Sequence, residues 1–269
     1  MDPAAQPGGA GPVSLIATDI RVSLGRKEIL HAVSVEARAG EITAIVGPNG
    51  SGKTTLMRSL TGELPSRGRI ALNGRDIARM SPEELAQRRG VLPQAAALSF
   101  PFTVAEVVRI GVEARGERAE ALVPAALAAV DLPGFSGRLY QELSGGEQQR
   151  VQLARVLAQV WQPVDADGPR WLMLDEPVSS LDIAHQLTVM RLAADYAQAG
   201  GGVVAIMHDL NLTALFAQKL VLMSGGRVLC QGRPGEVLTD DSLSLAYGCR
   251  LRVNAVPDSG IWVLPHAAA

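Results

Sequence analysis

The sequence predicts an α/β protein whose core is a mainly parallel β-sheet, with an antiparallel β subdomain and an inserted helical subdomain. Three patterns support this class. A glycine-rich loop, Gly47–Thr55, stands between an apolar strand and a helix. Apolar strands alternate with helices between residues 171 and 223, which indicates a parallel sheet covered on both faces. Residues from about 95 to 161 follow a helical period and are interpreted as an insertion.

The part before the insertion is expected to be rich in strands. A helix is predicted from Ser81 because serine is a favoured N-cap, Pro82 suits the first helical position, and two acids follow. The expected order is an antiparallel pair of strands at 14–17 and 28–35 around a turn at 25–27, a strand at 42–46, a helix after the loop, a strand at 68–74 that ends in an Asn-Gly turn, the helix from Ser81, and a short strand at 90–94.

The second half of the chain is expected to hold three helices and then a β/α alternation. The third helix carries a predicted buried stripe of Val151, Ala154, Leu157, Val160 and Trp161. The expected order is helices at 103–108, 117–130 and 144–161, a strand at 171–174, a helix at 183–198, a strand at 203–207, a helix at 210–217, a strand at 220–223, a hairpin through Gly225-Gly226, and a weak terminal pair that turns at Pro257–Gly260. The expected limits are a flexible tail at 1–12, a main domain at 13–256 with the helical subdomain at about 95–161, and a tail at 257–269.

Composition narrows the class of protein. A length of 269 residues with 47% hydrophobic content suits one large domain with a substantial core. A net charge of −2 and an aromatic content of 4% argue against nucleic acid as the main partner. The two cysteines, Cys230 and Cys249, imply no disulfide framework and fit a reducing compartment. We expect residues 1–12 to be a tail rather than a signal peptide, and no apolar run is long enough to predict a membrane span.

The glycine-rich loop fits the pattern G-x-x-x-x-G-K-[ST]. Its glycines permit a tight turn that directs backbone N–H groups and a helix N-terminus at phosphate oxygens. Lys53 adds a positive charge, and the Thr54 hydroxyl is a candidate ligand for Mg²⁺. We therefore predict a nucleoside triphosphate site formed by Gly47, Pro48, Asn49, Gly50, Ser51, Gly52, Lys53, Thr54 and Thr55. The alternative is a glycine-rich turn that exposes a solvated lysine.

Two acids, Asp175 and Glu176, follow an apolar strand at the end where α/β sheets bind their ligands. Asp175 is a candidate to hold Mg²⁺ directly or through water. Glu176 is the candidate general base that polarises a water for in-line attack on the γ-phosphate. The alternative for the pair is an acidic turn between a strand and a loop.

Two further features have a functional and a structural interpretation. Leu143–Gln149 opens a helix with a serine cap and two glycines, which leaves N–H groups free to meet an anion. It is equally a good N-cap and nothing more. His208 ends a strand, where it is either structural or a donor to a phosphate oxygen.

Six motifs, in their order and spacing, resemble those of the ATP-binding cassette ATPases throughout the domain. They are Gly47–Thr55, Gln94, Leu143–Gln149, Leu174–Pro177, Ser180–Asp182 and His208. The resemblance implies ATP and Mg²⁺ as ligands and a head-to-tail homodimer with two ATP molecules at its interface. In such a dimer Ser144 and Gly146, with Gly145 between them, meet the γ-phosphate held by the other subunit.

The resemblance also assigns the remaining residues and the partners. It implies that Gln94 contacts Mg²⁺ and senses the membrane partner, that Asp182 links the two sites, and that His208 steadies the γ-phosphate. It further implies two membrane-spanning permease subunits, a periplasmic haem-binding protein, no nucleic acid, and a peripheral position on the cytoplasmic face of the bacterial inner membrane.

Finer features look like those of the ATPase subunit of bacterial haem (hemin) importers. These features are 90–94 with 100–104, the proline-bearing insert 161–171, 183–186 and 208–212. Asp209–Leu212 is shared with iron-siderophore and vitamin B12 importers, which remain the alternative, and the insert favours haem. Less favoured classes are a cassette that acts on nucleic acid or ribosomes, an ordinary phosphotransferase, and an export ATPase.

The sequence departs from the family pattern at two positions. Leu24 stands near the place where these ATPases usually stack adenine on an aromatic ring, so base recognition is expected to be weaker or to come from elsewhere. Val178 replaces a commoner threonine, which we expect to be tolerated. His185 and Cys230 are interpreted as structural residues rather than haem ligands.

Overall fold

The computed structural model describes residues 14–94, 100–113, 119–256, 259–261 and 263. The expected tail at 1–12, the start of the insertion at 95–99, the start of its second helix at 117–118, and the terminal turn at 257–258 lie outside these residues. Described residues 251–256 form no strand, so this half of the expected terminal pair is absent.

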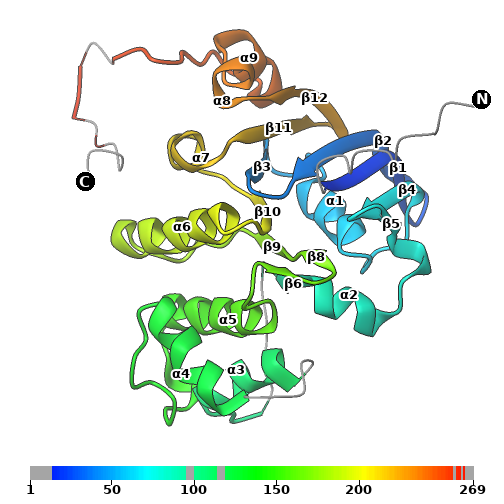
Figure 1. Ribbon diagram of the computed structural model, residues 1–269. Coiled ribbons are helices and arrows are strands. Elements are labelled where there is room, and N and C mark those ends of the chain that lie inside the picture. The colour runs from blue at the N-terminus through cyan, green and yellow to red at the C-terminus, as the bar shows by residue number, and fades with distance from the viewer. Residues whose placement is uncertain (1–13, 95–99, 114–118, 257–258, 262, 264–269) are drawn as a thin grey trace, which may run out of the picture.

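A six-stranded sheet forms the centre of the molecule, in the order β12-β11-β3-β10-β9-β6 (Figure 1). Its strands are β3 (Ile42–Val46), β6 (Arg89–Leu92), β9 (Trp171–Asp175), β10 (Gly202–Ile206), β11 (Lys219–Ser224) and β12 (Arg227–Gly232). The first five pair in parallel, and β12 pairs antiparallel with β11. Because parallel strands end at the same edge of a sheet, the residues that follow these strands are brought together.

A second, antiparallel sheet has the order β2-β1-β4-β5. Its strands are β1 (Ser14–Leu24), β2 (Lys27–Arg38), β4 (Arg67–Leu72) and β5 (Arg75–Asp76). The predicted Asn-Gly turn joins β4 to β5, with positive φ values of 50° at Asn73 and 77° at Gly74. Both central residues of a type I′ hairpin turn take positive φ values, which explains the Asn-Gly pair. The predicted antiparallel β part is therefore confirmed.

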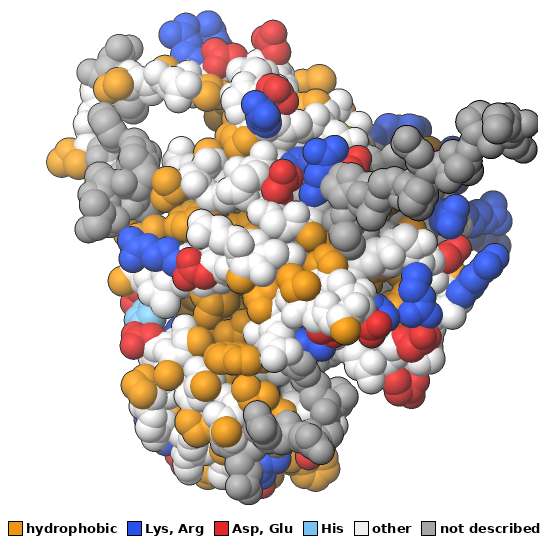
Figure 2. All heavy atoms as spheres, viewed as in Figure 1, with side chains coloured by type: hydrophobic (Ala, Val, Ile, Leu, Met, Phe, Trp, Pro, Cys, Tyr) orange, Lys and Arg blue, Asp and Glu red, His pale blue; other side chains and the backbone are white. Residues whose placement is uncertain are grey.

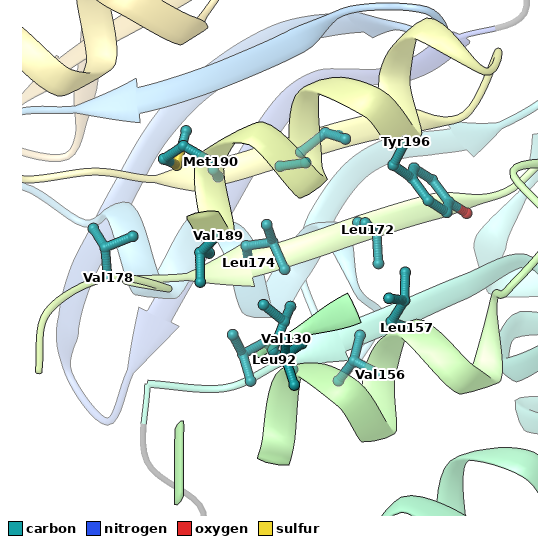
Figure 3. Close-up of a cluster of buried hydrophobic side chains, with 14 of the residues drawn as sticks. Leu92, Val130, Val156, Leu157, Leu172, Leu174, Val178, Val189, Met190 and Tyr196 are labelled. Atoms are coloured by element: carbon teal, nitrogen blue, oxygen red, sulfur yellow. The ribbon is translucent and has the colours of Figure 1, made fainter. Parts of the chain in front are cut away.

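The central sheet separates two hydrophobic layers, and β9 shows why. Its side chains alternate, since Leu172 and Leu174 face one layer while Trp171 and Met173 face the other. The second layer contains α1 (Lys53–Leu60) and the antiparallel sheet. The first contains α6 (Ile183–Gln198) and the helical group, which comprises α3 (Val104–Glu113), α4 (Ala119–Ala129) and α5 (Gly145–Gln159) (Figure 3).

The helix α5 is buried more deeply than its pattern predicted. Four members of the expected stripe are buried, but Trp161 is only partly buried, and the helix ends at Gln159, before Val160 and Trp161. Leu153 and Val156 lie outside the stripe and are also buried. The single stripe was too narrow because α5 contacts α3, α4 and β6 at once. A one-sided pattern identifies such a helix but does not show every face that it buries.

The remaining elements connect these layers. They are the 3₁₀ helices η1 (Ile77–Arg79) and η2 (Tyr140–Glu142), and α2 (Pro82–Arg88), α7 (Leu210–Phe216), α8 (Pro234–Val237) and α9 (Asp240–Tyr247). The insert 161–171 forms a small hairpin of β7 (Val164–Asp165) and β8 (Gly168–Pro169). Asn73 fixes it, because its amide donates to the Pro169 carbonyl at 2.7 Å and accepts from Trp171 Nε1 at 2.9 Å. Within the described ranges no helix is long and apolar enough to cross a membrane.

Candidate active site

The predicted site residues follow neighbouring strands and meet at one edge of the central sheet. The loop Gly47–Thr55 follows β3, Asp175 ends β9, Glu176 comes directly after it, and His208 follows β10. Gln94 follows β6, which lies beside β9. The site is therefore assembled by strand order from segments that are far apart in the sequence.

The glycine-rich loop Gly47–Thr55 has a backbone that only glycine suits at its start. Gly47 has a φ of 145°, and a Cβ atom there would lie 2.1 Å from the carbonyl oxygen of Met223. The N–H of Gly226 donates to the Ser51 carbonyl at 3.1 Å, so the turn after β11 supports the loop from outside. The helix α1 then begins at Lys53 with its first N–H groups directed at the loop.

Lys53 is buried beneath the loop. Its Nζ donates to the carbonyl oxygens of Gly47 at 2.8 Å and Pro48 at 3.0 Å. Burial lowers the pKa of Lys53, while the negative charges of Glu176 and Asp175 oppose that shift. The lysine is thus placed between the loop and the two acids.

Asp175 is buried, and its Oδ1 has no hydrogen-bond partner among the described residues. Burial raises the pKa of Asp175 to about 6, and the neighbouring charge of Glu176 adds to the shift. A hydrogen bond from Thr54 and the charges of Lys53 and His208 act against it. Thr54, Gln94 and Asp175 line a hollow of about 270 Å³. An orphaned carboxylate oxygen beside a hydroxyl and an amide suits a divalent cation.

Glu176 and His208 are in direct contact. The distance between Glu176 Oε1 and His208 Nε2 is 2.6 Å. The Glu176 side chain is 14% exposed and that of His208 is 43% exposed, so the pair lies where the site opens to solvent. The sequence left open whether His208 is structural or functional. In the structure His208 contacts Glu176, the candidate base.

The start of α5 is a second candidate site, separate from the phosphate loop within one chain. Ser144 caps the helix, donating to and accepting from Glu147 in a capping box. The backbone N–H and hydroxyl of Ser144 lower the pKa of Glu147. Ser144 and Gly145 are exposed. In Figure 1 α5 lies with α3 and α4, away from α1, so the structure does not bring Ser144, Gly145 and Gly146 to the loop of their own chain.

Three other residues singled out in the sequence have defined positions. Asp182 caps α6 and accepts from the backbone N–H of His185 at 2.9 Å, a bond that lowers the pKa of Asp182. The ring Nδ1 of His185 also contacts Asp182, at 2.8 Å. Leu24 ends β1 with half of its side chain exposed.

Sequence reasoning missed one contact of the site. Gln149 donates from Nε2 to the backbone carbonyl of Glu176 at 2.9 Å. The sequence named Gln149 only as the end of the motif that begins at Leu143. Because the two residues are 27 positions apart on different elements, no local pattern predicts their contact.

The replacement Asp175→Asn is expected to raise the free energy of unfolding at about pH 8 by roughly 1–3 kcal/mol, because it removes a buried charge. The carboxyl pKa rises from 3.8 to about 6 on folding, so between these values the native protein binds the extra proton. The stability that this proton contributes to the native protein therefore falls as the pH rises towards 6. The difference in melting temperature between variant and wild type, measured in EDTA, should shrink as the pH falls through about 6. A difference that is the same at every pH would refute this account.

Comparisons with known proteins agree with this arrangement. The profile of the ABC transporter family matches residues 30–179. The chain is 61% identical to a hemin import ATP-binding protein of Roseobacter denitrificans, over 95% of this chain and 99% of that protein. It is 58% identical to a protein of the same description from Rhizobium meliloti, over 94% and 98%. A solved ATP-binding cassette of an ABC transporter, MJ1267, superposes with a TM-score of 0.75 at 26% identity, covering 88% of this chain and 99% of that chain.

Proposed function

Since this chain belongs to the ABC transporter family, whose ATPases couple ATP hydrolysis to transport, we propose that it powers the import of haem (hemin) across the bacterial inner membrane. The observation that carries the proposal is the 61% identity to a hemin import ATP-binding protein over 95% of the chain. Import of an iron-siderophore complex or of vitamin B12 is the alternative. The insert 161–171, which forms β7 and β8, is the sequence feature that favours haem.

We propose that the loop from Gly47 to Thr55 binds the phosphates of ATP through its backbone N–H groups and the start of α1. Lys53 supplies positive charge from beneath this loop. Thr54, Asp175 and Gln94 are the residues that would hold Mg²⁺, and the orphaned Asp175 oxygen supports this assignment. Bound there, the ion would offset charge on the β- and γ-phosphate oxygens.

Glu176 is proposed as the general base. Its carboxylate accepts a proton from the attacking water while that oxygen bonds to the γ-phosphorus and the bond to the bridging oxygen breaks, leaving ADP. The contact with His208 supports this role, because an imidazole that donates Nε2–H to one carboxylate oxygen leaves the second oxygen free for water. We propose that His208 also steadies the γ-phosphate, with its Nε2–H then donated to the phosphate rather than to Glu176.

The complete site is proposed to need two copies of the chain. The exposed N-terminus of α5, with Ser144 to Gly146, would meet the γ-phosphate bound to the other subunit, and Asp182 would link the two sites. ATP drives closure in this scheme because it makes more contacts in the closed dimer than in the open one. Hydrolysis removes those contacts and resets the permease.

The helical group is the proposed docking side for the two permease subunits. Exposed hydrophobic side chains lie on it, at Ile110, and in the segments that flank its helices, at Phe100 and Leu139. Figure 2 shows hydrophobic side chains reaching the surface over this group, at the bottom of the view, and just above it. We propose that the helical subdomain covers about residues 95–161 of a main domain at 13–256. The chain is proposed to act at the cytoplasmic face of the membrane. A periplasmic haem-binding protein is the further proposed partner.

Reconstitution with the permease and its binding protein in vesicles tests the cargo. Haem-loaded binding protein is expected to stimulate ATP hydrolysis several-fold and to drive haem into the lumen. The chain alone should hydrolyse ATP weakly, because nothing couples its closure to a permease. Stimulation by a ferric siderophore or cobalamin but not by haem would replace the proposed cargo with the alternative.

A further inference from the structure

The backbone of Glu176 is held in an uncommon conformation. Its φ is +54°, in the left-handed region that residues other than glycine seldom occupy. Such a conformation persists only when the surroundings hold it, and it aims the side chain that follows. The groups that hold the Glu176 backbone therefore decide where its carboxylate points.

Among the described residues, three bind the main chain of Glu176. Its N–H donates to the Ile206 carbonyl at 3.2 Å, and its carbonyl accepts from the Ser179 N–H at 3.3 Å and the Ser179 hydroxyl at 3.2 Å. The shortest bond to the Glu176 main chain, at 2.9 Å, comes from the side-chain amide of Gln149 on α5, which donates to the Glu176 carbonyl. Gln149 is the one of these three partners that belongs to the helical group.

The start of α5 also packs against the loop that follows Glu176. A Cβ atom on Gly146 would lie 3.1 Å from the Ser180 carbonyl oxygen, so the helix and the loop are in close contact. From the other side, Gln186 of α6 donates to the Leu181 carbonyl at 3.0 Å. The segment from Glu176 to Asp182 is thus held between two helices.

We propose that Gln149 is a positioning residue for the general base Glu176. Its bond holds the left-handed backbone from which the Glu176 carboxylate is directed at the attacking water. This inference rests on the proposed function, in which Glu176 is the base.

The test replaces Gln149 by methionine, which keeps the length of the side chain and removes the donor. We expect kcat to fall about fivefold (range roughly two- to tenfold), as for the loss of one hydrogen bond, with ATP affinity within about twofold of wild type. The control is Gln159→Met on the same helix. Like Gln149, Gln159 donates from its side-chain amide to the main chain. Its acceptors are the carbonyls of Ala86 and Arg89, which lie far from the base. The control should keep the wild-type kcat, and Gln149→Asn serves if the methionine variant does not fold.

A double-mutant cycle with Glu176→Gln separates positioning from general destabilisation. If Gln149 acts through the base, adding Gln149→Met to Glu176→Gln should leave the residual single-turnover rate unchanged. A normal kcat for Gln149→Met, a loss matched by Gln159→Met, or a full additional loss in the double variant would each overturn the inference. Normal hydrolysis by Glu176→Gln alone would instead refute the proposed base.

Discussion

Replacing Glu176 by glutamine is expected to lower the rate of ATP hydrolysis by about 10²–10⁴-fold, the usual contribution of a general base. The amide cannot accept the proton of the attacking water, but it keeps the size of the carboxyl group. Because Glu176 lies beside the phosphate loop rather than in it, binding of ATP to a single subunit should be unchanged. The rate of phosphate release and the affinity for a fluorescent ATP analogue measure the two effects.

The same variant should accumulate as a dimer when Mg-ATP is added. ATP binding favours closure, and without hydrolysis the closed state has no route to reopen except loss of ATP. Size-exclusion chromatography with and without Mg-ATP detects this, and omission of Mg²⁺ should reduce the dimer. Glu36→Gln is a matched control, because Glu36 lies on β2 and pairs with Arg38 at 3.0 Å, away from the site. If Glu176→Gln retains wild-type turnover, another group must be the base.

Local patterns sufficed for the elements that define the fold. The apolar runs of β3, β9 and β10 are buried along their length, and such runs identify central strands of a parallel sheet. Helix starts were equally clear, since Ser81 and Ser144 each have a glutamate three residues later and form capping boxes. The predicted helix 183–198 has the limits of α6.

Elements that depend on distant partners were not predictable in this way. The strands of the hairpin β7–β8 have two residues each, and Asn73 holds the hairpin from almost a hundred positions earlier. The helix α8 has four residues, too few to show a period, and α9 was missed as well. The left-handed backbone of Glu176 also has no sequence signal, because it is imposed by tertiary contacts.

The site shows the same division between residue identity and pairing. The sequence named Asp175, Glu176 and His208 because each follows an apolar strand, and parallel strands gather such residues at one edge. Which side chains touch depends on strand order, which places β10 between β3 and β9. His208 and Glu176 are 32 positions apart, so their contact emerges only once the sheet is formed.

Replacing Ser144 by arginine is expected to remove ATP-driven dimerisation and to lower hydrolysis by at least about 100-fold, a loss typical of removing oxyanion or phosphate donors. Ser144 is exposed at the start of α5, where a long side chain would occupy the space proposed for the partner's γ-phosphate. The phosphate loop of the same subunit lies elsewhere, so each subunit should bind ATP with normal affinity. Equilibrium binding and analytical ultracentrifugation measure the two properties separately.

The difficulty with Ser144→Arg is that it also removes a helix cap, which costs about 1 kcal/mol of stability by itself. Ser81→Arg removes an equivalent cap, since Ser81 begins α2 with the same kind of capping box. It should show a similar loss of melting temperature with hydrolysis and dimerisation retained.

Mixing Ser144→Arg with Glu176→Gln subunits adds a further test. In that heterodimer the site with wild-type Glu176 faces the wild-type Ser144 of the other chain, so one composite site remains intact. Hydrolysis should recover in the mixture if two chains build each site, whereas two inactive pools that stay inactive when mixed would indicate that each chain works alone.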